Sequence, residues 1–159
     1  MPEFKLFLLI VTANAAPLLA GAVFGKLYDC PIDRGYRLMD GQELFGCSKT
    51  TRGIISALVL TGLVGVLLGI PLPLSLSVAL FAMLGDLFSS FIKRRLKLAP
   101  GSMALGLDQI PESLLPLLAI QDAADLKVQS IIWIVIGFML FELLISRILY
   151  LLHIRRRPY

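Results

Sequence analysis

The sequence predicts an all-α integral membrane protein, a single bundle of about five transmembrane helices. Of its 159 residues, 57% are hydrophobic and 16% are charged, whereas soluble domains have roughly 45–50% apolar and about 25% charged residues. The mean hydropathy is +0.84. These values exclude an ordinary soluble globule. Five apolar runs take up most of the chain, so we expect one membrane domain over residues 1–159, with no room for a separate soluble catalytic domain.

The apolar runs are the candidate spans, because about 20 apolar residues cross the hydrocarbon core of a bilayer. They lie at about 4–24, 54–70, 74–91, 105–120 and 128–152. Pro71 and Pro73 mark a tight hairpin between the second and third runs, since proline lacks the backbone donor that a continuing helix needs. Pro111 and Pro116 interrupt the fourth run. A re-entrant or half-spanning helix is therefore the alternative there.

The lysines and arginines predict the side that each loop faces. Of the 15, 12 lie in the loop over 25–53, in the loop over 92–104 and in the tail after the fifth run. Because cytoplasmic loops carry the excess of Lys and Arg, we expect both loops and the tail in the cytoplasm, with the N-terminus outside. A four-span arrangement would separate the basic loops from the basic tail. The same bias accounts for the net charge of +4, so the expected partner is the bilayer and not a nucleic acid.

Asp86 lies within the third run, where an ionisable side chain is costly and usually marks function. Ser90, Lys93 and Lys97 follow it at i+4, i+7 and i+11, which places all four on one stripe of a helix. The stripe predicts an anion-binding path that leads from a carboxylate in an inner cavity to the basic loop. The alternative is that the lysines only anchor the helix among lipid headgroups.

Asp108 stands near the start of the fourth run, one short loop after the third, so we expect it to face the same cavity as Asp86. Glu112 is four residues further on, and two unpaired carboxylates on one helix face repel each other. Mg²⁺ relieves such repulsion, since it binds one or two carboxylates together with substrate phosphates and water. Asp86 and Asp108 are therefore the predicted Mg²⁺ ligands. The alternative is a structural ion pair with Lys93 or Arg94.

The loop over 25–53 is too long for a plain connection in so small a protein. It holds turns that present carboxylates, followed by basic and hydroxyl groups at the start of the second helix, where a helix N-terminus favours anions. Its candidate substrate-binding residues are Asp33, Asp40, Lys49, Thr50 and Arg52. The alternative is a solvated loop among headgroups. Asn14 in the first run is either a site residue or a partner in a helix–helix hydrogen bond.

Two separated motifs resemble those of the membrane CTP:lipid-phosphate cytidylyltransferases. The segment GDLFSSFIKR at 85–94 is similar to their GD-x3-S-x2-KR signature, and LDQ at 107–109 is similar to their LD-[RQ] element. The resemblance is strongest to the CDP-archaeol synthase family of small five-span proteins. It extends over nearly the whole chain, including Asn14, the turns at Asp33 and Asp40, and KTTRG at 49–53. The tail from His153 to Tyr159 resembles the family's ending more weakly.

The chain departs from the family pattern after the second motif. The family usually has another aspartate three residues after the aspartate of that motif, where this chain has Pro111 followed by Glu112. Glu112 is a candidate replacement for it. The departure bears on the substrate more than on the reaction.

The resemblance implies an enzyme that transfers a cytidylyl group from CTP to a membrane lipid phosphate, similar to archaetidic or phosphatidic acid, and releases pyrophosphate in phospholipid biosynthesis. It implies catalytic roles for Asp86, Asp108, Lys93 and Arg94, with Mg²⁺ at the two aspartates. The implied substrate-binding residues are Asn14, Asp33, Asp40, Lys49, Thr50, Arg52, Ser90, Gln109 and Glu112. A lipid phosphate is already ionised at neutral pH, so no histidine base is needed, and the chain has one histidine. A homodimer is left open.

Two other function classes compete with this interpretation. A small proton- or cation-coupled transporter could use Glu142 or Asp86 as its site within the membrane, but it would not need most of its basic residues at one face. A non-enzymatic scaffold that binds anionic lipids explains the basic loops. It leaves the buried carboxylates unexplained.

Overall fold

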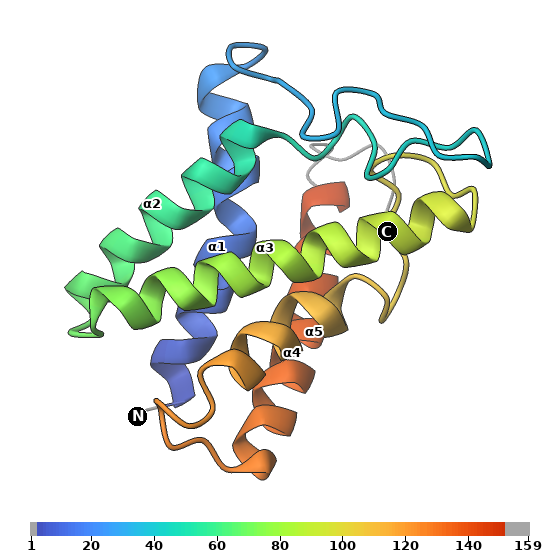
Figure 1. The fold of residues 1–159 in the computed structure, drawn as a ribbon. Coiled ribbons are helices and arrows are strands. Elements are labelled where there is room, and N and C mark those ends of the chain that lie inside the picture. Colours follow the sequence, from blue (N-terminus) through green and yellow to red (C-terminus); the bar gives the residue numbers. More distant parts are fainter. Residues whose placement is uncertain (1–2, 152–159) are drawn as a thin grey trace.

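The structure is a computed structural model that describes residues 3–151, with side chains described for residues 3–148. The chain forms five helices over this range, which confirms the predicted all-α fold (Figure 1). The helices are α1 (Glu3–Phe24), α2 (Thr51–Leu67), α3 (Leu72–Arg95), α4 (Gln109–Ala119) and α5 (Val128–Leu151). The tail from His153 to Tyr159 lies outside the described residues.

Within the described residues, three helices are long and apolar enough to cross a membrane, namely Glu3–Phe24, Leu72–Arg95 and Val128–Ile148. The second helix, Thr51–Leu67, is apolar but shorter. It begins three residues before the predicted span, because the Thr50 side chain caps it by accepting a hydrogen bond from the Gly53 amide at 3.2 Å. The predicted hairpin follows α2 and places Pro71 directly before α3.

The fourth helix corrects the prediction of a full span over 105–120. It has 11 residues, and at about 1.5 Å per residue this length reaches only about half of a core roughly 30 Å thick. Residues before Gln109 form turns, and Gly106 adopts a φ of +76° that a helix does not allow. The half-length alternative therefore describes α4.

The two long connections lie at the same end of the bundle, which we call the loop end (Figure 1). They cover residues 25–50 and 96–108 and replace the predicted bounds of 25–53 and 92–104, because α2 starts earlier and α3 continues to Arg95. The start of α1 and the connection between α4 and α5 lie at the opposite end (Figure 1). The arrangement thus gathers the basic loops at one face.

The core changes in character along the bundle. Toward the start of α1, large side chains from four helices pack together, including Leu9, Val78, Leu117 and Phe138. Nearer the loop end, the buried cluster is made mainly of alanines on α1, α2 and α3, joined by Met83. Small side chains let α1, α2 and α3 pack closely together at this end of the bundle.

Candidate active site

A cavity of about 740 Å³ opens at the loop end and reaches down between the helices. All five helices or the residues next to their ends contribute to its wall, together with both long connections. Its charged and polar lining includes Asn14, Asp29, Lys49, Thr50, Arg52, Asp86, Ser90, Lys93, Arg94, Asp108, Glu112 and Glu142. The cavity therefore brings together most of the residues that the sequence singles out.

Asp86 lies in the middle of α3 and forms an ion pair with Lys49 from the first connection. Gly85, the residue before it, packs against the backbone of α4. A Cβ atom there would overlap the carbonyl oxygen of Pro111 and lie 2.8 Å from the amide nitrogen of Glu112. The glycine thus allows the start of α4, with its own carboxylates, to lie beside Asp86.

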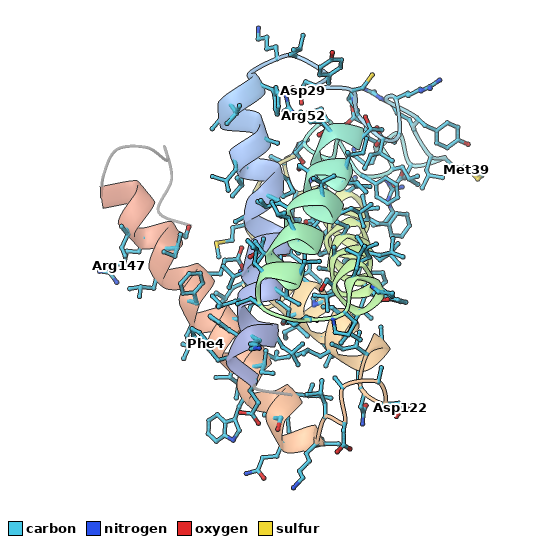
Figure 2. All side chains as sticks on the ribbon, turned by 90° about the vertical axis from the view of Figure 1, so that its left-hand side faces the viewer. Phe4, Asp29, Met39, Arg52, Asp122 and Arg147 are labelled. Atoms are coloured by element: carbon cyan, nitrogen blue, oxygen red, sulfur yellow. The ribbon has the colours of Figure 1, made fainter. Side chains whose placement is uncertain are left out.

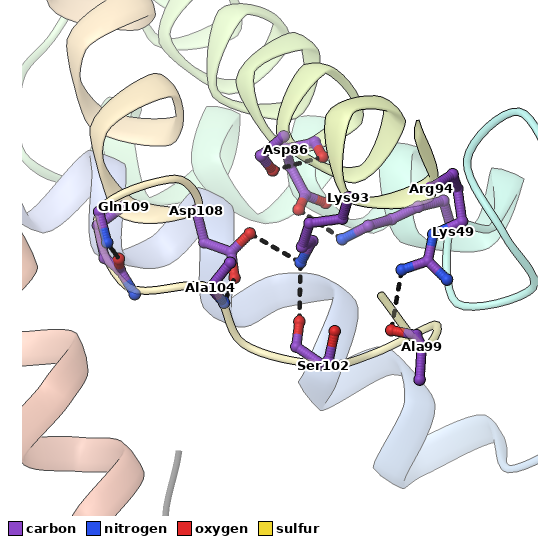
Figure 3. A network of polar contacts seen from close by, with 11 residues as sticks. Lys49, Asp86, Lys93, Arg94, Ala99, Ser102, Ala104, Asp108 and Gln109 are labelled. Atoms are coloured by element: carbon purple, nitrogen blue, oxygen red, sulfur yellow. Dashed lines mark hydrogen bonds and ion pairs between the residues drawn. The ribbon is translucent and has the colours of Figure 1, made fainter. Parts of the chain in front are cut away.

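Asp108 lies directly before α4 and pairs with Lys93 at 2.7 Å (Figure 3). This pair is buried, with side-chain exposures of 9% for Asp108 and 7% for Lys93. Lys93 also donates to the Ser102 carbonyl at 2.9 Å, and the second carboxylate oxygen of Asp108 accepts from the Ala104 amide at 2.8 Å. The pair therefore fixes the second connection between the ends of α3 and α4.

Arg94 follows Lys93 and is 3% exposed. Its guanidinium donates to the Ala99 carbonyl at 2.8 Å (Figure 3). Lys93 and Arg94 thus supply the hydrogen bonds that backbone carbonyls of the connection need as it dips toward the bundle, where unpaired carbonyls would be costly. Both side chains also line the cavity.

Glu112 and Glu142 place further carboxylates deep in the cavity. Glu112 is 6% exposed and interacts electrostatically with Asp86, Glu142 and Lys49. Glu142 is missing from the predicted substrate site, although its position in an apolar helix marks it as a functional candidate. The missing information is the rotation of α5 about its axis, which hydropathy does not define when nearly every residue is apolar.

The start of α2 forms the cavity wall nearest to α1. Arg52 donates to the Gly25 and Leu27 carbonyls, both at 2.7 Å. It also pairs with Asp29 at 3.1 Å, and Figure 2 labels both residues. These contacts join the end of α1 to α2. Asn14 lines the same wall, and its side-chain amide donates to the Ile10 carbonyl of its own helix at 3.0 Å.

The predicted stripe on α3 is present for three of its four members. Asp86, Ser90 and Lys93 line the cavity. Lys97 does not, because α3 ends at Arg95 and the backbone turns into a left-handed conformation at Lys97, with a φ of +59°. Its side chain lines a smaller pocket beside the first connection.

Three predicted substrate-binding residues lie outside the cavity. Asp33 accepts hydrogen bonds from the amides of Phe45, Gly46 and Gly35, at 2.9 to 3.0 Å, and so shapes its own loop. Asp40 pairs with Arg95 at 2.7 Å. Gln109 is fully buried, and its side-chain oxygen accepts from the Gly106 amide at 2.7 Å. In this structure all three hold the connections in place.

The hydrogen bonds of Asp33 also change its acidity. Partial burial by itself would raise the pKa of this carboxyl, but the amides of Phe45, Gly46 and Gly35 stabilise its ionised form. Their combined effect is larger, so the pKa of Asp33 lies below its usual 3.8. The loop is therefore built around an ionised carboxylate.

The donor set for a metal consists of carboxylates, which are the oxygen ligands that Mg²⁺ prefers. Among the described residues, no three or more His, Cys, Asp or Glu side chains are grouped as a complete metal site. Asp86 and Asp108 each face a lysine. Mg²⁺ does not need a full protein cage when substrate phosphates supply the remaining oxygens, so the residues fit a metal that arrives with a polyphosphate. The two ligands stay a prediction.

The cavity carries both positive and negative side chains, which indicates the kind of ligand that it can bind. Four cationic side chains, Lys49, Arg52, Lys93 and Arg94, line the same cavity as the carboxylates described above. The cations suit a polyphosphate, and the carboxylates beside them suit a divalent cation that accompanies it. The part of the lining that the described residues form contains no histidine.

Comparisons with known proteins agree on one family. Residues 4–159 match the family described as CarS-like: CDP-archaeol synthase. A CDP-archaeol synthase of Pyrobaculum arsenaticum is 34% identical over the full length of both chains. One from Pyrococcus furiosus is 41% identical over 107 residues, which cover 61% of this chain and 60% of that relative. For the latter protein and that of Thermococcus onnurineus, the match thus spans about three fifths of the relative's length.

A solved structure has the same fold. It is described as an intramembrane enzyme for archaeal membrane lipids biosynthesis, and it is 31% identical with a TM-score of 0.77. The match covers 89% of this chain and 90% of that one. Together with the long apolar helices, this likeness makes the chain an integral membrane protein.

Proposed function

The chain belongs to the CDP-archaeol synthase family, and from this premise we propose that it transfers a cytidylyl group from CTP to a membrane lipid phosphate. The products are a CDP-lipid and pyrophosphate. The observation that carries the proposal is the cavity itself, which joins cations at the loop end to buried carboxylates between the helices. A transporter gains no support, since the matching family is described as a synthase and the solved relative as an enzyme.

The nucleotide enters from the loop end. Lys49, Arg52, Lys93 and Arg94 line the cavity there and provide the donors that neutralise a triphosphate. The start of α2 adds the partial positive charge of a helix N-terminus. Thr50 and Ser90 supply hydroxyl groups along the same path.

The reaction needs alignment and charge neutralisation more than proton transfer. An ionised oxygen of the lipid phosphate attacks the α-phosphorus of CTP, and the bond from that phosphorus to the β-phosphate oxygen breaks to release pyrophosphate. Lys93 and Arg94 stabilise the charge that grows on this leaving group. Holding the two phosphates in line inside one cavity contributes the remaining acceleration.

Asp86 and Asp108 would hold Mg²⁺ in the loaded enzyme. The metal would supply charge neutralisation at the phosphate oxygens. Until then Lys49 and Lys93 neutralise the two carboxylates, so nucleotide binding must redistribute these lysines toward phosphate. The ion pairs keep the carboxylates in the cavity wall before the substrate arrives.

The lipid phosphate reaches the cavity from the side, between α1 and α5. These helices touch near the start of α1, where Phe7 and Phe141 form an edge-to-face pair, and they diverge toward the loop end (Figure 2). Leu18 of α1 lines the cavity although the residue is 65% exposed. The cavity therefore reaches the lipid-facing surface, so the headgroup can enter while the chains stay in the bilayer.

We place the loop end in the cytoplasm. Most lysines and arginines lie there, as the positive-inside rule requires of the cytoplasmic face, and CTP is supplied from that side. The N-terminus is then outside.

The test uses the purified full-length protein in detergent with labelled CTP, Mg²⁺ and a panel of ether-linked and ester-linked lipid phosphates. We expect a labelled CDP-lipid and release of pyrophosphate with at least one lipid. If no lipid phosphate yields a CDP-lipid and CTP does not bind, the proposal is wrong. Ion flux into protein-containing vesicles without CTP would support the transporter instead.

A further inference from the structure

A second, smaller pocket lies beside the active-site cavity. It has a volume of about 330 Å³ and is formed by the first connection on one side and the residues after α3 on the other. Arg37, Arg94 and Lys97 bring three positive charges to it, and Glu43 brings one negative charge. The neighbouring carboxylate of Asp40 is neutralised by Arg95. The pocket is therefore electropositive.

Arg94 lines both spaces, together with Ala99 and Pro100, and is, among the described residues, the one charged residue that they share. It is almost completely buried. An anion in either space would lie beside its positive charge.

Lys97 lines this pocket from a backbone conformation with positive φ, which is unfavourable for a lysine. Its amide donates to the Arg94 carbonyl, and the Leu98 amide donates to the Lys93 carbonyl, both at 3.0 Å. This pattern is a Schellman motif, in which the position of Lys97 is usually glycine because φ is positive. A lysine at a φ of +59° is strained relative to glycine, and it places an ammonium group at the rim of the pocket.

We propose that this second pocket is an anion site that receives pyrophosphate as it leaves the active-site cavity. The inference rests on the proposed function, because pyrophosphate is a product only of that reaction. Arg94 contacts the leaving group on the cavity side and the departed product on the pocket side, while Arg37 and Lys97 provide the second set of charges. Pyrophosphate then leaves without passing back over the bound lipid.

Direct binding of inorganic pyrophosphate tests the site in the full-length protein. The active-site cavity is first saturated with a non-hydrolysable CTP analogue, and pyrophosphate is then titrated by calorimetry. We expect residual binding in the wild type and at least a tenfold loss of affinity in the double variant Arg37→Gln with Lys97→Gly. Affinity for the analogue should stay unchanged. The control Lys26→Gln removes an exposed charge outside both spaces and should behave as wild type.

Glycine is chosen at position 97 so that a loss of pyrophosphate affinity can be distinguished from a loss of folding. Glycine accepts the positive φ without strain, so Lys97→Gly alone should keep or raise the melting temperature while pyrophosphate affinity falls. Absence of residual pyrophosphate binding in the wild type, or equal affinity in the double variant, overturns the inference. If the analogue does not bind and no CDP-lipid forms, the proposed function has failed, and titration of the unsaturated protein still shows whether the pocket takes the anion.

A lipid headgroup could present the same phosphate chemistry, and nanodiscs distinguish the two sources. We expect the same pyrophosphate affinity in nanodiscs of neutral and of anionic lipid. A tenfold or greater loss in anionic nanodiscs would assign the pocket to a lipid headgroup and contradict the role in product release.

Discussion

Lys49 and Asp86 form an ion pair that joins the connection after α1 to the middle of α3. The two residues are 37 positions apart in the chain. Both residues line the cavity, so the pair connects the loop wall to the helix wall of the site. A change at either residue therefore affects both the shape and the charge of the site.

Replacing either aspartate should remove activity, and Asp108→Asn should also lower the melting temperature because it leaves the buried Lys93 without its ionised partner. Asp86→Asn and Asp108→Asn keep the side-chain volume but lose the charge that would hold Mg²⁺, so we expect CDP-lipid formation to fall at least a hundredfold. Asp122→Asn, at an exposed position at the opposite end, is the matched control and should retain wild-type turnover. Wild-type turnover in either of the first two variants would refute their assignment as metal ligands.

Lys93→Met should destabilise the protein as well as impair it. The substitution leaves the buried Asp108 carboxylate without its partner, and removing one member of a buried ion pair costs about 3–5 kcal/mol. The melting temperature in detergent should fall clearly. Lys127→Met, at an exposed residue, should leave it unchanged, and equal melting temperatures for both variants would contradict the structural role.

Gly85→Ala should separate α3 from α4. The added methyl group would overlap the Pro111 backbone, and overpacking of this kind costs about 1–3 kcal/mol. Gly137→Ala is the matched control in another helix, because its Cβ would meet only Phe7 at an ordinary 3.8 Å. Thermal unfolding should rank Gly85→Ala below wild type and Gly137→Ala at or above it; the reverse order would be incompatible with the packing described above.

Asp33 should make the first connection sensitive to acid. Unfolded, this carboxyl takes up its proton near pH 3.8, whereas the folded group does so only at lower pH. Its stabilising contribution is therefore complete above pH 3.8 and is lost as pH falls through the lower, folded pKa. Limited proteolysis of the loop should show Asp33→Asn as more susceptible than wild type at pH 6. The difference should vanish at strongly acid pH, and a constant difference would show that ionisation is not the cause.

Leu18→Trp should hinder the lipid and spare the nucleotide. The indole would fill the place where the cavity reaches the lipid-facing surface of α1, so kcat/KM for the lipid phosphate should fall at least tenfold while the affinity for CTP stays unchanged. Leu19→Trp is a suitable control, since Leu19 is also exposed but does not line the cavity. Equal effects of both substitutions would argue against lateral entry at this point.

The sequence predicted five helices and the gathering of the basic loops at one end, because hydropathy and the placement of Lys and Arg report them directly. The full length predicted for the fourth helix was wrong, since turns that include Gly106 at positive φ precede Gln109. The sequence also predicted that Asp86 and Asp108 would line one cavity, since a short connection joins their helices.

Glu142 was absent from the predicted site because an almost uniformly apolar helix gives no clue to its rotation. Asp33 and Lys97 were predicted to lie along the site, but neither lines the cavity. Local hydrogen bonds turn Asp33 toward its own loop, and α3 ends just before Lys97.

Arg95 connects the end of α3 to the exposed part of the first connection. It pairs with Asp40, donates to the Gln42 and Glu43 carbonyls, and lies 5.2 Å above the ring of Phe91. These contacts fasten the projecting loop that carries the fully exposed Met39 (Figure 2) to the last turn of α3. The position of this loop thus depends on the position of the last turn of α3. A spectroscopic label at position 39 would therefore report, from outside the cavity, whether the last turn of α3 moves during turnover.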